Sequence, residues 1–400
     1  MINVIGLGYI GFPTALMLQT GGNQVIGTDI NPEKINQLNE GNITFEEKGL
    51  SELFREASVK GIVFTTEYKQ AEIYLIAVPT PYNKRSKKID SSYVVAAVKK
   101  VLEVCPDDAI VIIESTISPN TIDHLIRPLA GEKIVHFVHA PERIIPGDMI
   151  HELRYNSRII GADTEEIAEK VKSIYATFCV GEIVITDIRT AEMSKVAENT
   201  YRDINIAYAN ELAMICNISG LDVYEVIKIA NMHPRVNILQ PGPGVGGHCL
   251  SIDPWFLVGD YPDIVHVIKA AREVNDAMPE YILEKVAEIM DRHGIKDIKK
   301  VGLYGLTYKE NVDDTRESPA LQMLASMKKH LACGINVYDP YVQYDVVENQ
   351  YHSLDKFIED MELIVILVAH DEIIQQQEKL NSKLVFDTRG KLSLKHIYHL

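Results

Sequence analysis

The chain has 400 residues, more than one compact domain holds and enough for two or three. Hydrophobic residues make up 46% and charged residues 24%, as in an ordinary globular enzyme. The net charge of −16 disfavours a general affinity for nucleic acid or for an anionic membrane surface. No apolar run reaches the roughly 18 residues of a membrane-spanning helix. The first predicted strand begins at Ile2, so we expect no signal peptide and a cytoplasmic protein.

The first part of the chain alternates predicted strands with predicted helices, a pattern typical of a parallel, doubly wound sheet. We expect strands at 2–7, 24–29, 74–78, 109–113 and 134–138, and helices at 13–19 and 91–104. Helical periodicity alone is present from about 190 to 220 and from about 264 to 293. Alternation then returns, with strands expected at 301–306, 335–339, 363–368 and 383–387.

This layout predicts an α/β protein in which two Rossmann-like, doubly wound domains are joined by a central helical region. The boundaries that we expect are 1–189, 190–294 and 295–400. We find no internal sequence repeat. The five cysteines, at 105, 179, 216, 249 and 333, are scattered, odd in number and free of any CxxC pair. That spacing disfavours a disulfide framework or a structural zinc site, so we expect no metal and small buried cysteines except at Cys249.

A glycine-rich turn follows the first predicted strand. Gly6, Gly8 and Gly11 form a GxGxxG that opens a helix, and Asp29 ends the next strand 18 residues after Gly11. The glycines allow a pyrophosphate to approach the helix N-terminus, and the carboxylate would accept hydrogen bonds from ribose hydroxyls. Because Ile30 and Asn31 offer no arginine for a 2′-phosphate, the pattern favours NAD over NADP. The alternative is a glycine turn that binds nothing.

The most informative stretch is Gln240-Pro-Gly-Pro-Gly-Val-Gly-Gly-His-Cys-Leu-Ser-Ile-Asp253. Its glycines and prolines exclude a helix or a strand and favour a loop of preset shape that brings backbone close to a ligand. A cysteine at the end of such a loop is available for nucleophilic attack if a cation favours its thiolate. Asp253 would follow Cys249 by one helical turn if a helix starts there.

Five groups of residues, in this order, resemble the UDP-glucose/GDP-mannose dehydrogenase family over essentially the whole chain. They are the N-terminal GxGYxG; Glu114-Ser-Thr116; Ala191-Glu-Met-Ser-Lys195 with Asn199; Gly246-Gly-His-Cys249 with Asp253; and Lys309 with Asp314-Thr-Arg316. The resemblance implies NAD binding by residues 1–189, a cysteine loop and a homodimer contact in 190–294, and UDP-sugar binding by 295–400. We therefore expect the cofactor NAD, a UDP-sugar substrate, and neither nucleic-acid nor membrane partners.

The family's chemistry is a four-electron oxidation of a sugar's C6 hydroxyl to a carboxylate, with two NAD consumed. The resemblance makes Cys249 the nucleophile that forms a thiohemiacetal and then a thioester. It makes Lys195 and Asn199, one helical turn apart, donors to the developing oxyanion. Asp253 and Thr116 would position water and hydroxyl protons, and Glu142 would serve thioester hydrolysis. The alternatives are a solvated helix lysine at 195 and an ordinary loop carboxylate at 142.

Two departures argue against UDP-glucose as the substrate. Pro146 stands where glucose enzymes carry a second glutamate, and His248 stands where they carry serine. The segment His233-Pro-Arg235-Val-Asn237 and the cysteine loop are instead similar to family members that act on UDP-N-acetylmannosamine. We therefore expect oxidation of UDP-N-acetylmannosamine to UDP-N-acetylmannosaminuronate, with Arg235 and His248 recognising the N-acetylated sugar.

The expected binding residues form two sets. The cofactor set is Gly6, Gly8, Tyr9, Ile10, Gly11, Asp29, Lys34, Thr80, Thr116 and Arg316. The substrate set is Glu142, Arg143, Lys195, Asn199, Arg235, Asn237, Gly246, His248 and Lys309. Lys309 would contact substrate phosphate or sugar just past a strand end, where α/β sheets bind ligands. Arg316 would face the cofactor, and the alternative is a surface ion pair with Asp313 or Glu317.

Three other functions are weighed against this one. A UDP-N-acetylglucosamine 6-dehydrogenase would share the Gly-Gly-His-Cys loop, and only the region of Arg235 discriminates the two. An NAD-retaining nucleotide-sugar epimerase would need a Tyr-x-x-x-Lys pair, which does not occur between the third and sixth strands of the first domain. A catalytically dead sugar-nucleotide sensor would not need Cys249, Lys195, Asn199 and Asp253 together.

Overall fold

The computed structural model describes residues 1–83, 85–247, 249–329 and 334–400. His248 and Cys333, both named above, lie outside the described residues. The chain forms two compact units, Met1–Glu198 and Asn199–Leu400, here called unit 1 and unit 2. The long helix α7 (Ile188–Ser219) contains the boundary between them. The three-part division at 189/190 and 294/295 stays a prediction.

Unit 1 is built on a sheet of eight strands in the order β3-β2-β1-β4-β5-β6-β7-β8. The strands are β1 (Ile2–Ile5), β2 (Val25–Thr28), β3 (Val63–Thr65), β4 (Ile73–Ile76), β5 (Ala109–Ile113), β6 (Val135–His139), β7 (Arg158–Ala162) and β8 (Ile183–Thr186). Neighbours run parallel except β6 and β7, which are antiparallel. The first six strands have the order of a Rossmann sheet, so the predicted fold class is confirmed.

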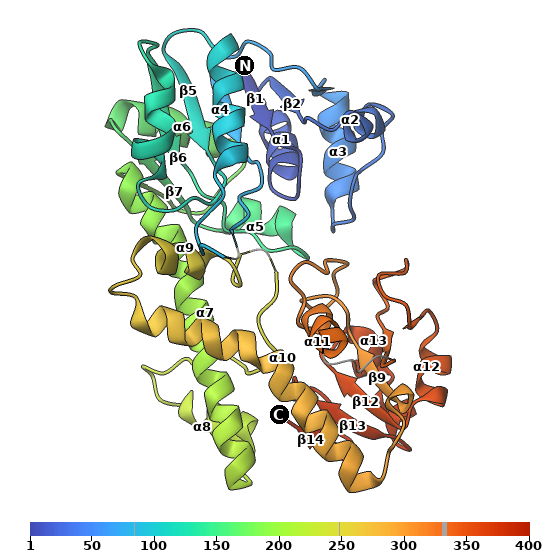
Figure 1. The fold of residues 1–400 in the computed structure, drawn as a ribbon. Coiled ribbons are helices and arrows are strands. Elements are labelled where there is room, and N and C mark those ends of the chain that lie inside the picture. The colour runs from blue at the N-terminus through green and yellow to red at the C-terminus, as the bar shows by residue number, and fades with distance from the viewer. Residues whose placement is uncertain (84, 248, 330–333) are drawn as a thin grey trace. The chain divides into compact units, whose positions relative to one another are not determined.

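Helices cover both faces of this sheet (Figure 1). They are α1 (Gly11–Thr20), α2 (Pro32–Asn39), α3 (Leu50–Val59), α4 (Ser92–Val104), α5 (Met149–Tyr155) and α6 (Glu165–Tyr175), with a π-helical turn at Ile122–Ile126 and a 3₁₀ turn at Arg127–Ala130. Along β4, Ile73 and Leu75 pack into the core with α1 and α3, whereas Tyr74 and Ile76 pack into the core with α4. This alternation explains why the strand reads as continuously apolar.

Unit 2 carries a second sheet, in which all six strands are parallel and follow the order β11-β10-β9-β12-β13-β14. The strands are β9 (Val301–Tyr304), β10 (Asn336–Tyr338), β11 (Gln350–Tyr351), β12 (Leu363–Ile366), β13 (Leu384–Asp387) and β14 (Ile397–His399). Counted from β9, this is the same order as that of the first six strands of unit 1. The prediction of a second Rossmann-like sheet is therefore also confirmed.

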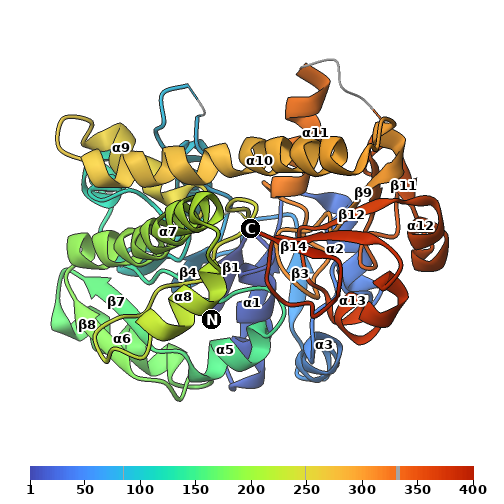
Figure 2. The same ribbon diagram turned by 90° about the horizontal axis from the view of Figure 1, so that it is seen from below.

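The helices of unit 2 are α8 (Val223–Ala230), α9 (Asp253–Asp260), α10 (His266–His293), α11 (Pro319–Lys329), α12 (Leu354–Asp360) and α13 (Asp371–Gln375), with 3₁₀ turns at Ile298–Lys300 and Gln377–Leu380. One face of the sheet packs against α10 and α11, together with α8 and the C-terminal half of α7. The other face packs against α12 and α13 (Figure 2). None of the helices within the described ranges is both long and apolar enough to cross a lipid bilayer.

Three very short strands are among the elements that the sequence pattern missed. β3, β11 and β14 have two or three residues each, too few to show a period. β7 and β8 were also not among the five expected strands; they extend the sheet of unit 1 beyond β6, and β7 runs antiparallel to β6. The helix expected at 13–19 spans Gly11–Thr20, so it begins at the last glycine of the GxGxxG.

Candidate active site

The glycine-rich turn of unit 1 joins β1 to α1, and each glycine has a distinct surrounding. Gly6 has φ +90°, and a Cβ there would lie 2.6 Å from the Ala77 carbonyl oxygen. At Gly11 a Cβ would lie 1.9 Å from the Gly6 carbonyl oxygen, so the helix start is packed onto the turn. At Gly8 a Cβ would meet nothing within 4 Å. This open space beside backbone is what a pyrophosphate needs.

Asp29 is placed as a ribose acceptor should be, at the end of β2. It is 8% exposed, and its Oδ2 accepts hydrogen bonds from the Leu7 N–H and the Lys34 Nζ, both at 2.9 Å. Its Oδ1 accepts from the Asn31 N–H at 3.0 Å. A carboxylate offers about four acceptor positions, so these bonds orient Asp29 and leave it able to accept ribose hydroxyls. Thr80, also in the expected cofactor set, is buried, and Tyr9 and Ile10 are half-buried.

The difference between these glycines predicts a selective loss of cofactor binding. Gly8→Ala should leave the thermal midpoint unchanged, because its Cβ meets nothing, but should weaken NAD binding about 5- to 100-fold by filling the ligand's space. Gly11→Ala should destabilise the fold itself, because its Cβ clashes with backbone. Calorimetric NAD titration beside thermal unfolding separates the two effects. Unchanged NAD affinity in Gly8→Ala would place the pyrophosphate elsewhere.

Glu142 belongs to a buried network of charges in unit 1. Its Oε2 accepts a hydrogen bond from the Arg158 guanidinium, and its Oε1 accepts from the Arg143 N–H at 2.6 Å. Arg158 also donates to Glu114 Oε1 at 3.3 Å, and the Tyr175 hydroxyl donates to the same oxygen at 3.2 Å. The ring of Tyr175 lies 4.4 Å from the guanidinium carbon of Arg158. Glu142 is thus a buried carboxylate oriented by its hydrogen bonds, and its role in thioester hydrolysis stays a prediction.

One arginine faces two carboxylates in this network, which favours a proton on one of them. Burial raises the pKa of Glu114 to about 8, against the opposing effect of Arg158, and the neighbouring charge of Glu142 adds to the increase. Glu114 Oε2 is buried with no hydrogen-bond partner, as suits the protonated oxygen better than a charged one. A neutral Glu114 leaves the charge of Arg158 to pair with Glu142.

This proton makes the stability of unit 1 depend on pH. Between the ordinary pKa of 4.5 and about 8, folded Glu114 keeps a proton that the unfolded chain releases. Stability therefore falls as pH rises through this window, by up to about 1.4 kcal/mol per pH unit. We expect Glu114→Gln, which keeps an acceptor for Tyr175, to remove that slope in guanidinium unfolding series. The exposed control Glu166→Gln should retain it, and an equal slope in both variants would contradict a neutral Glu114.

Lys195 is buried, with 6% of its surface exposed, and so are its helical neighbours Ala191 and Asn199 on α7. The alternative of a solvated helix lysine is therefore wrong. Thr116 lies half-buried in the loop after β5. Arg143 is bound within unit 1, since its guanidinium donates to Glu198 and to the Ser157 carbonyl oxygen, the latter at 3.0 Å. A substrate that binds Arg143 would have to compete with these hydrogen bonds or use the remaining N–H groups of the guanidinium.

In unit 2 the structure brings together three of the predicted catalytic residues. The Asp253 N–H donates to the Cys249 carbonyl oxygen at 2.8 Å, so one helical turn separates the two residues as expected. Asn199, which lies one turn after Lys195 on α7, donates from Nδ2 to Asp253 Oδ2 at 2.6 Å. Asn199 and Asp253 are buried, whereas Cys249 is exposed. The thiol is thus open to a ligand beside an oriented, buried carboxylate.

The loop before Cys249 is held by residues that sequence reasoning did not assign. Asn210 accepts from the Gly242 N–H at 2.9 Å, and the Gly247 N–H donates to the Arg316 carbonyl oxygen at 3.0 Å. At Gly246 a Cβ would lie 2.6 Å from the Cβ of Tyr308, so only glycine fits. Gly246 is therefore a packing position against the loop after β9. The sequence analysis gave Asn210 no role, because its partner Gly242 lies 32 residues along the chain.

The remaining predicted residues of unit 2 lie in loops. Arg316 forms an ion pair with Asp314, with Nη2 to Oδ2 at 2.6 Å, a partner that the alternative of a surface pair did not include; its role toward the cofactor stays a prediction. Because Asp314 is buried, this ion pair differs from an ordinary pair between two exposed side chains and helps to fix the loop. Lys309 is half-buried after β9. Arg235 and Asn237 are exposed, and Asn205 donates to the Asn237 carbonyl oxygen at 2.8 Å, which anchors their segment to α7.

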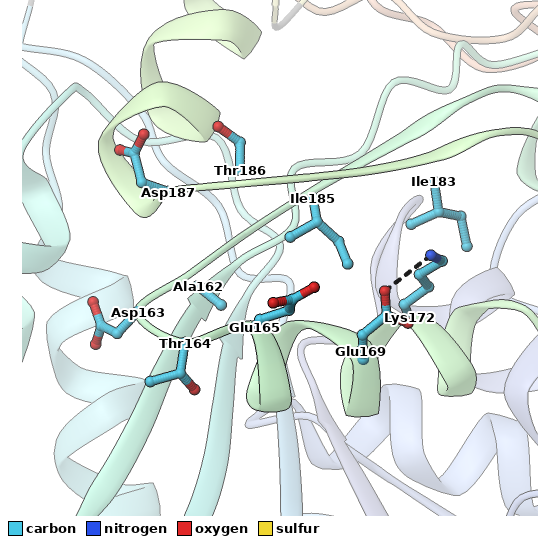
Figure 3. Close-up of a pocket in the computed structure, with 10 residues that line it drawn as sticks. All are labelled: Ala162, Asp163, Thr164, Glu165, Glu169, Lys172, Ile183, Ile185, Thr186 and Asp187. Carbon is cyan, nitrogen blue, oxygen red and sulfur yellow. Dashed lines mark hydrogen bonds and ion pairs between the residues drawn. The ribbon is translucent and has the colours of Figure 1, made fainter.

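A pocket of about 510 Å³ lies in unit 1 beside β8 (Figure 3). In the order of the sheet, β8 is the edge strand farther from β1, which precedes the glycine turn. Its lining includes the carboxylates of Asp163, Glu165, Glu169 and Asp187, and its single lysine, Lys172, is bonded to Glu169 at 3.1 Å. Such a surface repels phosphate groups. Among the described residues, no cluster of three histidine, cysteine or acidic side chains is placed to hold a metal ion.

Known family models match three successive segments of the chain. The NAD binding domain of the UDP-glucose/GDP-mannose dehydrogenase family matches residues 1–179. The central domain of that family matches residues 189–277, and its UDP binding domain matches residues 302–393.

Individual proteins resemble the chain over almost its full length. A UDP-N-acetyl-D-mannosamine dehydrogenase of Methanococcus maripaludis is 44% identical, covering 98% of this chain and 93% of the relative. An NDP-N-acetyl-D-galactosaminuronic acid dehydrogenase of Ralstonia nicotianae is 40% identical, covering 99% and 97%. The solved structure of the UDP-N-acetyl-mannosamine dehydrogenase of Staphylococcus aureus is 40% identical, with a TM-score of 0.89, and the match covers 100% of this chain and 97% of that one.

Proposed function

Because the chain belongs to the UDP-glucose/GDP-mannose dehydrogenase family, we propose that it oxidises C6 of UDP-N-acetylmannosamine to the carboxylate of UDP-N-acetylmannosaminuronate. The chain is an oxidoreductase whose N-terminal segment binds NAD. The observation that carries the proposed chemistry is the exposed Cys249 one turn from Asp253, whose carboxylate is bonded to Asn199. The relative and the solved structure that carry the name of the mannosamine enzyme support the choice of sugar.

The residues divide the chemistry as follows. Bound NAD supplies a hydride acceptor for each of the two oxidations. The Cys249 thiolate attacks the aldehyde carbon to form a thiohemiacetal, and the second oxidation leaves a thioester. Water, deprotonated by Glu142, then replaces sulfur and releases the carboxylate. One sugar thus loses two hydrides and gains one oxygen from water. Lys195 and Asn199 would stabilise the negative charge that develops on the C6 oxygen, and Thr116 and Asp253 would orient protons.

The UDP part would lie on unit 2, with Lys309 at a phosphate or the sugar. The predicted roles of Arg235 and His248 in recognising the N-acetyl group remain part of this proposal. Arg235 is exposed on a segment that Asn205 anchors, so it is available to a ligand. Arg235→Ala should raise the Michaelis constant for the N-acetylated sugar nucleotide, and an unaltered constant with unaltered turnover would remove that role. A location in the cytoplasm also remains part of this proposal.

The test of the function is the NADH formed per sugar nucleotide consumed. Purified enzyme would be supplied separately with UDP-N-acetylmannosamine, UDP-N-acetylglucosamine, UDP-N-acetylgalactosamine and UDP-glucose. We expect two NADH per sugar with the mannosamine compound alone. One NADH per sugar would exclude the thioester route. Turnover with another sugar only would preserve the chemistry and overturn the substrate, and the galactosamine arm addresses the relative from Ralstonia nicotianae.

We also propose a homodimer that uses α7. Tyr201, Tyr208 and Ile215 are 61%, 51% and 57% exposed and recur every seven residues, so they form an apolar stripe on one helix face. An exposed stripe with this spacing suits antiparallel or parallel packing against the same stripe of a second copy. We expect sedimentation equilibrium to give twice 44.9 kDa for the native chain.

A charge within this stripe should separate the copies. We expect Tyr208→Asp to sediment as a monomer, whereas Val59→Asp should remain dimeric, because Val59 is 85% exposed on α3 and is not part of the stripe. A native chain that sediments at 44.9 kDa would refute the dimer. A dimer that persists in Tyr208→Asp would move the interface to another surface.

A further inference from the structure

His370 is a buried ionisable residue of unit 2 to which the proposed chemistry gives no role. It lies in the turn between β12 and α13, directly before Asp371, and its side chain is 0% exposed. The Asn311 N–H donates to Nδ1 at 2.9 Å, so Nδ1 carries the lone pair. Nε2 therefore carries the hydrogen, and it faces Asp339 Oδ2 at 3.2 Å. The ring thus bridges a loop backbone and a carboxylate.

Asp339, at the end of β10, holds the start of the same loop. Its Oδ2 accepts hydrogen bonds from the Leu306 N–H at 2.6 Å and the Thr307 N–H at 3.0 Å. The Thr307 hydroxyl in turn donates to the Lys309 carbonyl oxygen at 3.0 Å. Together with the bond from Asn311 to His370, these contacts hold the loop after β9 at three points between Leu306 and Asn311.

The two Rossmann-like sheets use this carboxylate position differently. Gly6 and Gly305 each follow the first strand of their sheet, with φ of +90° and +100°. Asp29 bonds the N–H of Leu7 just as Asp339 bonds that of Leu306, at the same step of the same strand order. Asp29 remains accessible at 8% exposure, whereas the Asp339 side chain is 0% exposed and closed off by His370. In unit 2 the position fixes a loop and cannot accept a ribose.

This loop carries one expected substrate contact and also supports the backbone that leads to Cys249. It carries Lys309, and it ends at Arg316, whose carbonyl oxygen accepts from the Gly247 N–H at 3.0 Å. The ring of Tyr308 would lie 2.9 Å from a Cβ at Gly247, which shows how closely the loop supports the backbone that leads to Cys249. A shift of the loop would therefore displace a phosphate contact and the nucleophile together.

We propose that His370 is a positioning residue that, through Asp339 and Asn311, holds the loop 306–316 in the conformation that binds the sugar nucleotide. This role rests on the proposed function, because it concerns the same site. Of the expected NAD contacts, Arg316 lies in unit 2, at the far end of this loop and fixed by its own ion pair with Asp314, whereas the others lie in unit 1. Loss of the bridge should accordingly affect the sugar nucleotide and spare NAD.

Two substitutions take the bridge apart. His370→Gln keeps an N–H donor near the place of Nε2 but loses the acceptor for the Asn311 N–H, while His370→Asn keeps that acceptor and loses the donor to Asp339. Loss of the hydrogen bond from the Asn311 N–H to the buried ring should raise the Michaelis constant for UDP-N-acetylmannosamine about 3- to 10-fold. The constant for NAD should change less than about twofold. His370→Asn should show a smaller increase, because the loop contact remains.

The control is Tyr338→Phe, which removes the hydrogen bond from the hydroxyl to Glu372 in the same unit without touching the loop. It should leave both constants unchanged. If His370→Gln fails to fold, Thr307→Val tests the same loop from its own side and should raise the sugar-nucleotide constant alone. The role of His370 would be overturned if the folded variants kept the native Michaelis constant for the sugar nucleotide. It would also be overturned if the Michaelis constant for NAD rose by the same factor. A native enzyme that oxidises none of the sugars would instead refute the proposed function.

Discussion

Replacing Cys249 with serine is expected to lower the rate of acid formation by at least about 10³-fold, because a serine hydroxyl is a far weaker nucleophile than a thiolate at neutral pH. The first oxidation does not need the sulfur. A small amount of aldehyde with one NADH per sugar should therefore be detectable at high enzyme concentration. Mass spectrometry of the native enzyme, quenched during turnover, should show a sugar nucleotide attached to Cys249.

The matched control is Cys216→Ser, which changes a buried cysteine of the same unit. It should cost some stability through the core and still yield two NADH per sugar. If Cys249→Ser retained both the rate and the stoichiometry of the native enzyme, the covalent route would be excluded, although NAD binding and family membership would stand. The two variants thus separate a chemical role for sulfur from a packing role.

Replacing Arg272 with methionine is expected to destabilise unit 2 by about 3 to 5 kcal/mol, because it leaves a buried carboxylate without its cation. Arg272 is 1% exposed and donates to Asp203 Oδ1 at 2.5 Å, and Asp203 is 0% exposed. Asn275 donates to the same oxygen at 2.8 Å and accepts from Asn210, which bonds the Gly242 N–H of the cysteine loop. Activity should therefore fall together with stability.

Arg272 also offers an internal control, since it has a second partner, Asp276, whose side chain is 46% exposed. Asp276→Ala should cost less than about 1 kcal/mol, as exposed ion pairs do. Asp203→Asn combined with Arg272→Met should recover part of the lost stability, because no buried charge then remains. Chemical unfolding of these three variants and of the native chain measures the differences. Equal effects of Arg272→Met and Asp276→Ala would contradict the special weight of the buried pair.

Local spacing sufficed for the parts of the site that lie close together in the chain. The strand, glycine turn and helix around Gly8 are one continuous segment, and Asp29 ends the next strand. The turn from Cys249 to Asp253 spans four residues, so its geometry also follows from local backbone hydrogen bonding. The strand alternation of both sheets was visible because buried parallel strands read as apolar runs.

Residues whose partners lie far along the chain could not be assigned in this way. Arg158 reaches Glu142 across 16 residues and Glu114 across 44, and His370 reaches Asp339 across 31. In the sequence these are ordinary charged residues. Their roles depend on which strands are neighbours and in which register, and packing of the whole core decides that. For the same reason, the sequence left open whether Lys195 is buried and which residue pairs with Arg316.

The amino-acid pattern alone was therefore enough for the two Rossmann-like sheets, for NAD as the cofactor and for the turn that separates Cys249 from Asp253, because each depends on short-range spacing or on the order of motifs. Only the folded chain decided which carboxylate keeps a proton, which arginine orients Glu142, and that Asp339 fixes a loop while Asp29 stays open to a ribose. Charged side chains acquire such roles from burial and from partners brought together by sheet packing, and neither is visible before the chain folds.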